Sequence, residues 1–308
     1  MKYRFQTCLR FPFLHKTLWA PCVLFVWWGA AAAQNNARPT TVSVLDFGSS
    51  SFAPLASTKI RQVVSKIEGL TLLDAGLTRA AAKGAGYSGS LNMLVSEARD
   101  LGAALSSDFY LIGDAQTLRR SSSATPIFFE SYCSIFVISS RSGKLVLWDR
   151  LSADSSSPAE AEQQLIEQLQ DRALAKRLSA AIQKSQDDER ALRAVVNATV
   201  PLIEAAPDDE RVAEAEGLRL PRPFSRLRPE YPLSASKADA EATVDVLVDV
   251  RADGEVDNVE VVRWAGFGLD EATVATVRQL HFFPAMKNGI PVPLRVLLRY
   301  NFRKPATP

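Results

Sequence analysis

Histidine and cysteine are scarce in this chain of 308 residues, which has two histidines and three cysteines. His15, Cys8 and Cys22 fall within the first 33 residues, so His281 and Cys133 alone represent these residue types in the rest of the sequence. Histidine and cysteine metal sites, Ser-His-Asp triads and disulfide frameworks all need more of these residues. We therefore predict no enzymatic activity, no metal, no cofactor and no catalytic residue, and we expect Cys133 to be a small buried residue of a strand.

A surplus of basic charge is also missing from most of the chain. There are 36 Lys and Arg against 34 Asp and Glu, and all four charges of residues 1–33 are basic. The rest of the chain therefore carries 32 basic and 34 acidic groups. Because nucleic-acid binding needs a basic patch or tail, a nucleic-acid partner is not expected.

Long apolar runs are confined to the N-terminus. Residues 1–16 are basic and contain no acidic group, residues 17–30 are strongly apolar, and Ala31-Ala32-Ala33 follows. This is the order of a secretory signal, and the run is shorter than the roughly 20 residues of a spanning helix. We predict a signal peptide or an N-terminal membrane anchor in residues 1–33. The body is expected in the periplasm, either exported or anchored to the inner membrane, with membrane contact through residues 1–33 alone if they stay uncleaved.

Residues 40–182 alternate strand and helix patterns. Short β-like runs begin near Val42, Leu70 and Phe109, and amphipathic helical spacing separates them. A hairpin of residues 127–138 and 145–148 follows, and Ser157-Pro158-Ala159-Glu160 predicts the start of one long closing helix. The sequence therefore predicts an α/β domain with a mixed sheet.

Short motifs link this region to a known group of envelope domains. Val42-Ser43-Val44-Leu45-Asp46-Phe47, the strand end Leu72-Leu73-Asp74, and residues 102–113 with Asp108-Phe109 resemble the N-terminal domain of TolB and related CsgG-type domains over about residues 40–155. The resemblance implies a non-catalytic module that docks other envelope components. It assigns no site residue.

Two further features of this region suggest chemistry but have simpler explanations. Residues 84–89 match G-x-G-x-x-G, yet no strand precedes them directly, so a flexible loop is expected rather than a dinucleotide site. Asp46, Asp74 and Asp108 end predicted strands, where paired carboxylates could serve a hydrolase or a ligand-binding protein. Acids at strand ends are more often turn formers or helix caps.

Residues 183–225 have the composition of a connector. Helical character continues to about residue 197, a short acidic helix is expected near residues 208–217, and prolines cluster between Pro221 and Pro232. This predicts a helical and proline-rich connector between two domains.

Residues 226–308 predict a β-β-α-β domain with a three-stranded antiparallel sheet, which makes the whole chain α+β. Valines alternate from Val244 to Val250, Asp253-Gly254 turns the chain, and a helix begins at Leu269. The last strand alternates from Val292 to Phe302. Because prolines cannot donate to a ladder, this strand is expected at a sheet edge, where it could add a partner strand or merely resist aggregation.

Several motifs of this region resemble the C-terminal domain of the TonB family. They are Pro229-Glu230-Tyr231-Pro232, Ala242-Thr243-Val244, Asp253-Gly254-Glu255-Val256, Gly268-Leu269-Asp270, Phe283-Pro284-Ala285, Gly289-Ile290-Pro291-Val292 and Tyr300-Asn301-Phe302. The resemblance implies that the last strand pairs with an outer-membrane receptor or another envelope protein. It implies these partner-binding residues: Tyr231, Pro232, Pro291, Val292, Leu294, Arg295, Val296, Leu297, Leu298, Arg299 and Tyr300.

The sequence departs from the energy transducers of this family. His15 precedes the apolar segment instead of lying within it, a globular domain replaces the long proline-rich arm, and Trp264-Ala265-Gly266 replaces a small-residue pair. We therefore predict a periplasmic interaction module that binds a peptide strand. The alternatives are an anchored transducer for receptor-mediated import and a periplasmic hydrolase or ligand-binding protein that uses the first domain.

Overall fold

The computed structural model describes residues 38–121, 127–195, 203–207 and 209–304. From residue 39 onward, the described residues form one compact unit. In the part of the chain that is described, no helix combines the length and the apolar character needed to cross a membrane. The predicted signal peptide or anchor, residues 1–33, lies outside the described residues.

The first half folds around a five-stranded mixed sheet, here called the N-terminal sheet, with strand order β2-β1-β4-β5-β6. Its strands are β1 (Thr40–Val44), β2 (Leu70–Leu72), β4 (Phe109–Arg120), β5 (Phe128–Ser139) and β6 (Leu145–Ser155). β1 runs parallel to β2 and β4, and β5 runs antiparallel to β4 and β6. This is the mixed sheet that the sequence predicts.

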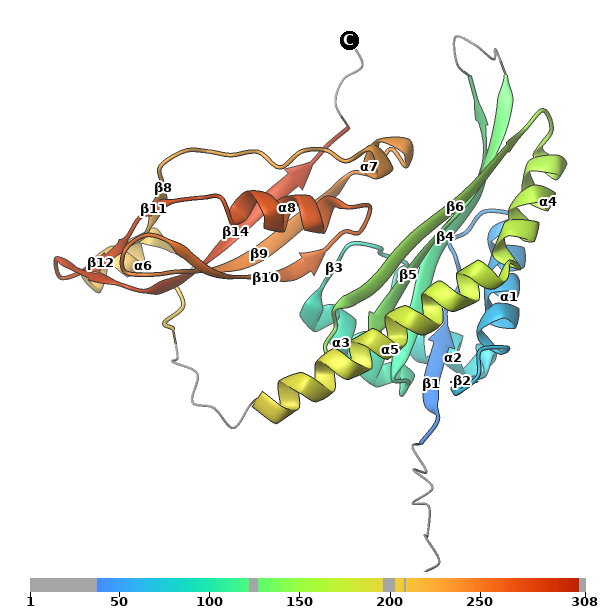
Figure 1. Ribbon diagram of the computed structural model, residues 1–308, viewed down its shortest axis with the longest axis horizontal. Helices are drawn as coiled ribbons and strands as arrows, with labels where there is room; N and C mark the ends of the chain where they lie inside the picture. Colours follow the sequence, from blue (N-terminus) through green and yellow to red (C-terminus); the bar gives the residue numbers. More distant parts are fainter. Residues whose placement is uncertain (1–37, 122–126, 196–202, 208, 305–308) are drawn as a thin grey trace, which may run out of the picture. The chain divides into compact units, whose positions relative to one another are not determined.

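Helices cover both faces of the N-terminal sheet (Figure 1). They are α1 (Ala53–Val64), α2 (Ala75–Gly84), α3 (Val95–Leu105), α4 (Pro158–Leu169) and α5 (Arg172–Val195). Apolar side chains of α1, α4 and α5 share one core with Phe109 and Leu111, and those of α2 and α3 share another with Tyr110 and Ile112. Because the beginning of β4 is buried on both faces, residues 109–112 form a continuous apolar run in the sequence.

The predicted single closing helix is wrong, because the chain forms two helices there. Ser157 caps α4 as expected, accepting a hydrogen bond from the N–H of Glu160 at 3.3 Å. The helix ends at Leu169, and the Asp171 carboxylate accepts from the N–H of Ala173 at 3.0 Å. A side chain that bonds the local backbone in this way starts a new helix instead of continuing the old one.

The second half is built on an antiparallel sheet, here called the C-terminal sheet, with strand order β14-β9-β10-β3. It contains β9 (Ala242–Val250), β10 (Val256–Trp264) and β14 (Leu294–Phe302), with α8 (Leu269–Val277) packed on one face. Its fourth strand, β3 (Met93–Leu94), comes from the first half of the chain. The predicted three-stranded sheet therefore gains a strand that the sequence did not indicate.

Short elements complete the second half: α6 (Glu210–Ala215), β7 (Leu218–Arg219), β8 (Arg222–Pro223), α7 (Leu233–Lys237), β11 (Phe282–Phe283), β12 (Ala285–Lys287) and β13 (Ile290–Val292). The prediction of one last strand from Val292 is wrong. β13 pairs with β12 in a small separate sheet, and the chain enters β14 only after Pro293, whose nitrogen has no hydrogen to donate.

Candidate functional site

The outer edge of β14 is the site that the sequence predicts, and the structure confirms that β14 is an edge strand. The N–H of Arg295 donates away from the sheet to the carbonyl of Glu204 at 2.9 Å, and the N–H of Ala206 donates to the carbonyl of Arg295 at 2.8 Å. Residues 204–206 thus cover the beginning of this edge. Because the backbone of a strand bonds to alternate sides, residues 297, 299 and 301 point their N–H and C=O groups outward like Arg295.

Arginines and aspartates form a ladder on the outer face of the C-terminal sheet. Asp245 and Asp249 of β9 are almost fully buried, with exposed fractions of 1% and 4%. Arg299 binds Asp245 through two hydrogen bonds of 2.7 and 2.9 Å, and Arg295 binds Asp249 through two of 2.5 and 2.8 Å. Arg263 adds a bond of 3.2 Å to Asp245.

These pairs keep both aspartates ionised. Hydrogen bonds from Arg295 hold the pKa of Asp249 below its ordinary value. Burial alone would raise the pKa of Asp245, but the bonds from Arg299 and Arg263 outweigh it and lower that pKa. Arg295 and Arg299 therefore neutralise buried charges, and their side chains are engaged before any partner arrives.

The remaining predicted partner-binding residues do not all gather at this edge. Leu297 is the exposed apolar side chain between the two arginines, with half of its surface accessible. Val296, Leu298 and Tyr300 point to the other face, where they pack on the core of the C-terminal sheet, and Leu294 is buried. Pro291 and Val292 belong to β13 and lie outside the C-terminal sheet.

Tyr231 and Pro232 have structural contacts of their own. The Tyr231 hydroxyl donates to the carbonyl of Ala240 at 2.7 Å, and Pro232 precedes the first turn of α7. These contacts hold the chain that enters the C-terminal sheet. A role of the two residues in partner binding stays a prediction.

The three acids at the strand ends do not all converge. Asp46 and Asp74 follow the neighbouring parallel strands β1 and β2 at the same edge, where both act on Arg61, whereas Asp108 lies beside the start of β1. Asp46 pairs with Arg79 at 2.9 Å, Asp74 accepts from the N–H of Leu77 at 2.9 Å, and Asp108 accepts from the N–H of Thr41 at 2.8 Å. Each acid is thus engaged by a cation or a backbone N–H, and the arrangement gives no support to a pair of catalytic carboxylates.

The structure also places the glycine-rich segment 84–89 and Cys133. Gly84 ends α2 and the next element is the two-residue strand β3, so residues 84–89 lack the strand, turn and helix of a dinucleotide site. Cys133 is fully buried in β5, and burial raises the pKa of its thiol. Across the described ranges, no three His, Cys, Asp or Glu side chains gather to hold a metal ion.

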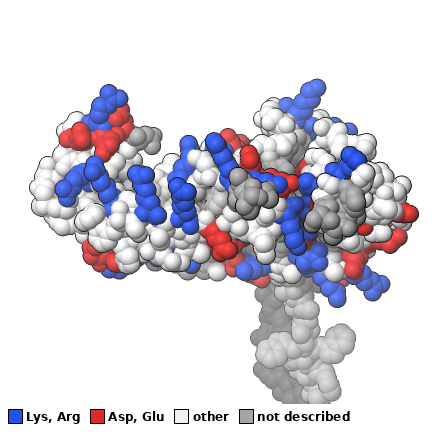
Figure 2. Space-filling view, turned by 90° about the horizontal axis from the view of Figure 1, so that it is seen from above, with Lys and Arg blue, Asp and Glu red and all other residues white. Residues whose placement is uncertain are grey.

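Both signs of charge are present on the face drawn in Figure 2. Blue Lys and Arg side chains stand in a row there, and red acidic side chains lie close to its ends. The face is therefore not the uniform basic patch that binding to nucleic acid requires.

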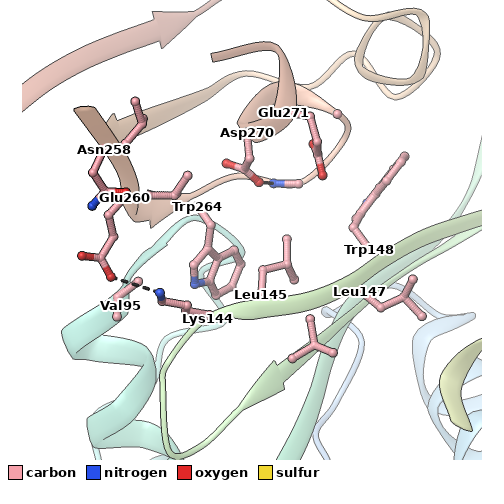
Figure 3. A pocket seen from close by; sticks show the side chains of 15 residues that line it. Val95, Lys144, Leu145, Leu147, Trp148, Asn258, Glu260, Trp264, Asp270 and Glu271 are labelled. Carbon is pink, nitrogen blue, oxygen red and sulfur yellow. Dashed lines mark hydrogen bonds and ion pairs between the residues drawn. The ribbon is translucent and has the colours of Figure 1, made fainter. Parts of the chain in front are cut away.

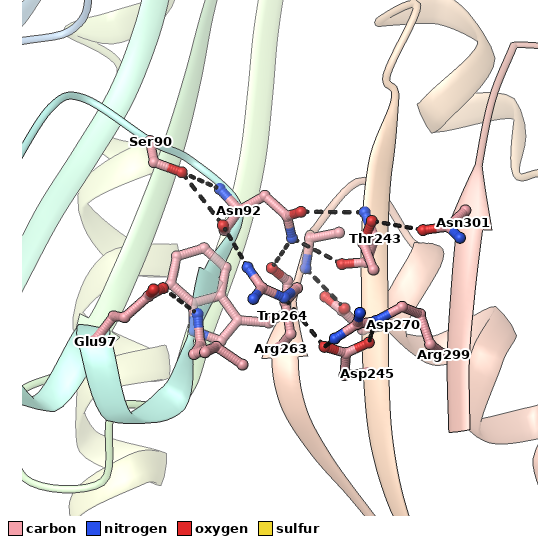
Figure 4. Close-up of polar contacts among 12 residues, drawn as sticks. Ser90, Asn92, Glu97, Thr243, Asp245, Arg263, Trp264, Asp270, Arg299 and Asn301 are labelled. Atoms are coloured by element: carbon pink, nitrogen blue, oxygen red, sulfur yellow. Dashed lines mark hydrogen bonds and ion pairs between the residues drawn. The ribbon is translucent and has the colours of Figure 1, made fainter. Parts of the chain in front are cut away.

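Asn92 links the loop before β3 to the C-terminal sheet (Figure 4). Its side-chain oxygen accepts from the N–H of Thr243 at 3.1 Å. Its nitrogen donates to the carbonyls of Thr243 and Trp264 at 2.8 and 2.7 Å. One amide thus serves three backbone groups of β9 and β10, a role that sequence patterns do not reveal.

Replacing Asn92 by alanine is expected to lower the free energy of unfolding by about 1–3 kcal/mol, because it leaves these backbone groups without a partner. Urea unfolding would measure the change. Ser88→Ala is the matched control, since Ser88 lies in the same loop and its side chain is exposed. A loss no larger than that of the control would contradict the role of Asn92.

Comparison with known proteins identifies the C-terminal region. Residues 228–303 match the family described as Gram-negative bacterial TonB protein C-terminal, which confirms a TonB C-terminal domain in this chain. No curated protein sequence matches the chain.

Solved structures with similarity to parts of the chain come from several bacteria. The TonB C-terminal domain of Pseudomonas aeruginosa is 21% identical and covers 29% of this chain and 90% of its own, with a TM-score of 0.24. The hypothetical protein CT253 of Chlamydia trachomatis is 14% identical over 42% of this chain and 93% of its own, with a TM-score of 0.30. The LpoB C-terminal domain of Salmonella enterica is 14% identical over 37% and 82%, with a TM-score of 0.28. The resemblance of residues 40–155 to TolB and CsgG stays a prediction, as do the predicted domain boundaries.

Proposed function

We propose that this protein is a cell-envelope interaction module that binds an extended peptide strand of an outer-membrane partner in the periplasm. The strand adds to the outer edge of β14 along residues 297–301. One observation carries the proposal: the outward backbone groups of these residues have no partner among the described residues, and they lie in the TonB C-terminal domain. Backbone hydrogen bonds give such complexes their affinity.

Because residues 204–206 cover the start of the β14 edge, a partner strand can pair only with the later residues of β14. Residues 204–206 already bond to Arg295, and Lys287 holds Glu204 at 3.2 Å. A partner strand of about five residues fits beside residues 297–301 without displacing this segment. Leu297 and the aliphatic stems of the neighbouring arginines then supply apolar contact on the outer face.

Leu297→Pro tests the edge directly. Proline removes the outward N–H of residue 297 but no bond to β9, so the ladder is retained. Synthetic peptides carrying TonB boxes of outer-membrane receptors are expected to bind the variant about tenfold more weakly than the unmodified protein by calorimetry.

The control is Leu297→Ala, which removes the side chain and keeps the N–H. Equal affinity of the proline variant and the unmodified protein would overturn strand addition at β14. Absence of binding to any of the peptides would overturn the receptor as partner.

The alternative of an anchored energy transducer depends on residues 1–33. We expect a mature chain that begins near Gln34 and is recovered in the periplasmic fraction of a Gram-negative host. N-terminal sequencing with fractionation would measure this. An intact Met1 in the inner membrane would favour the transducer.

A further inference from the structure

A cavity of about 640 Å³ lies between β6, β10 and the loop that precedes α8 (Figure 3). Two uninterrupted runs line it, residues 144–148 at the start of β6 and residues 258–261 of β10. Successive side chains of a strand point to opposite faces. Runs without gaps therefore mean that the edges of both strands face the cavity.

Neither edge has a strand partner on the cavity side among the described residues. β6 is the last strand of the N-terminal sheet, and β3 pairs with β10 only at Arg263 and Trp264. β3 itself is an antiparallel strand added to this edge of β10, which shows that the edge accepts an added strand.

The register identifies which groups of β10 point into the cavity. β9 lies between β14 and β10, so its successive residues bond alternately to the two neighbours. Arg295 faces away from β9, so the adjacent Val296 bonds to Val248. Val259 lies opposite Val248 and therefore turns its own N–H and C=O away from β9, toward the cavity.

Lys144, which precedes β6, and Glu260 of β10 form an ion pair of 3.0 Å across the cavity.

The lining is mixed in character. Leu145, Leu147, Val261 and Trp264 contribute apolar surface, and Lys144, Asn258, Glu260, Asp270 and Glu271 contribute polar and charged surface.

We propose that an extended peptide strand of a partner protein inserts between β6 and β10 and pairs with the outward backbone groups of both. An extended peptide is the ligand class that carries donors and acceptors along two sides, and it would join the N-terminal and C-terminal sheets into one. This site lies on the edge opposite β14 and does not depend on the function proposed above.

Val259→Pro in the full chain tests the insertion. The probe is a blocked hexapeptide of alternating valine and threonine, and calorimetry measures its binding. Proline removes the N–H that faces the cavity and retains the bonds to β9, so affinity is expected to fall about tenfold. Leu297→Pro is the matched control, because it removes an equivalent N–H from the other edge of the same sheet, and it is expected to leave affinity unchanged.

A second measurement needs no variant of the protein. The same hexapeptide with alternate amides N-methylated lacks donors along one side, and it is expected to bind the unmodified protein about tenfold more weakly. Weaker binding to Leu297→Pro with normal binding to Val259→Pro would overturn the inference and place the strand on β14. Failure of the unmodified protein to bind the hexapeptide would also overturn it.

Discussion

Trp264→Ala is expected to lower the free energy of unfolding by about 3–5 kcal/mol, the usual cost of removing a fully buried Trp. Trp264 is 2% exposed. It belongs to β10, yet its ring packs in the core that Phe136, Tyr110 and Ile138 of the N-terminal sheet form. Its Nε1 also donates to the carbonyl of Gly143 at 3.1 Å. The substitution therefore removes a large, fully buried side chain that the two sheets share.

Urea unfolding followed by circular dichroism would measure this loss. Trp264→Phe is the matched variant, because it keeps an aromatic ring beside Phe136 but removes the hydrogen bond to Gly143 and part of the ring volume. We expect it to cost about 1–2 kcal/mol. A loss below about 1 kcal/mol for Trp264→Ala would contradict the shared core.

Strong periodicity made the C-terminal sheet predictable. The alternating valines of β9 and the alternation of β14 fix which side chains reach the core, because a strand has a period of two. The edge position of β14 followed from the prolines before it. The structure confirms both, although the last strand begins at Leu294 and not at Val292.

The sequence did not allow the pairing between distant segments to be predicted. β3 has two residues, too few for any periodic signal, and Asn92 reads as an ordinary loop residue. Both act across more than 150 residues of chain to reach Thr243 and Trp264. Interactions of this kind depend on tertiary packing rather than local propensity.

The aspartates of β9 show a second limit. Asp245 and Asp249 alternate with the core valines, so the pattern assigns them to the solvent face. They do lie on that face, but arginines of the flanking strands cover them. The sequence contains both partners, and only the register of β9 and β14 brings them together.

Asp270→Ala is expected to cost about 2–4 kcal/mol, because it leaves two buried N–H groups without an acceptor. Asp270 is 9% exposed, and its carboxylate accepts from the N–H groups of Ala265 and Gly266 at 2.9 and 2.7 Å. These bonds hold the turn at residues 266–268, where three successive residues have positive φ. The turn presents Phe267 to Phe136 and Trp148 of the N-terminal sheet.

Asp270 should also make stability depend on pH. Burial raises its pKa from 3.8 to about 7, although the two N–H bonds oppose the shift. Between about pH 4 and pH 7 the folded protein then holds a proton that the unfolded chain releases. The contribution of Asp270 to the free energy of unfolding is therefore fully present below pH 4, falls as the pH rises through 7, and levels off above it. The shift corresponds to a total on the order of 4 kcal/mol.

Urea unfolding of Asp270→Asn between pH 4 and pH 8 isolates this titration, because the amide keeps the shape of the side chain and cannot ionise. The difference between the unmodified protein and the variant is expected to shrink steadily toward high pH. Asp257→Asn is the control, since the Asp257 side chain is exposed and its removal should leave the pH dependence unchanged. The same slope in the unmodified protein and in Asp270→Asn would mean that Asp270 is ionised throughout, and that the two N–H bonds outweigh its burial.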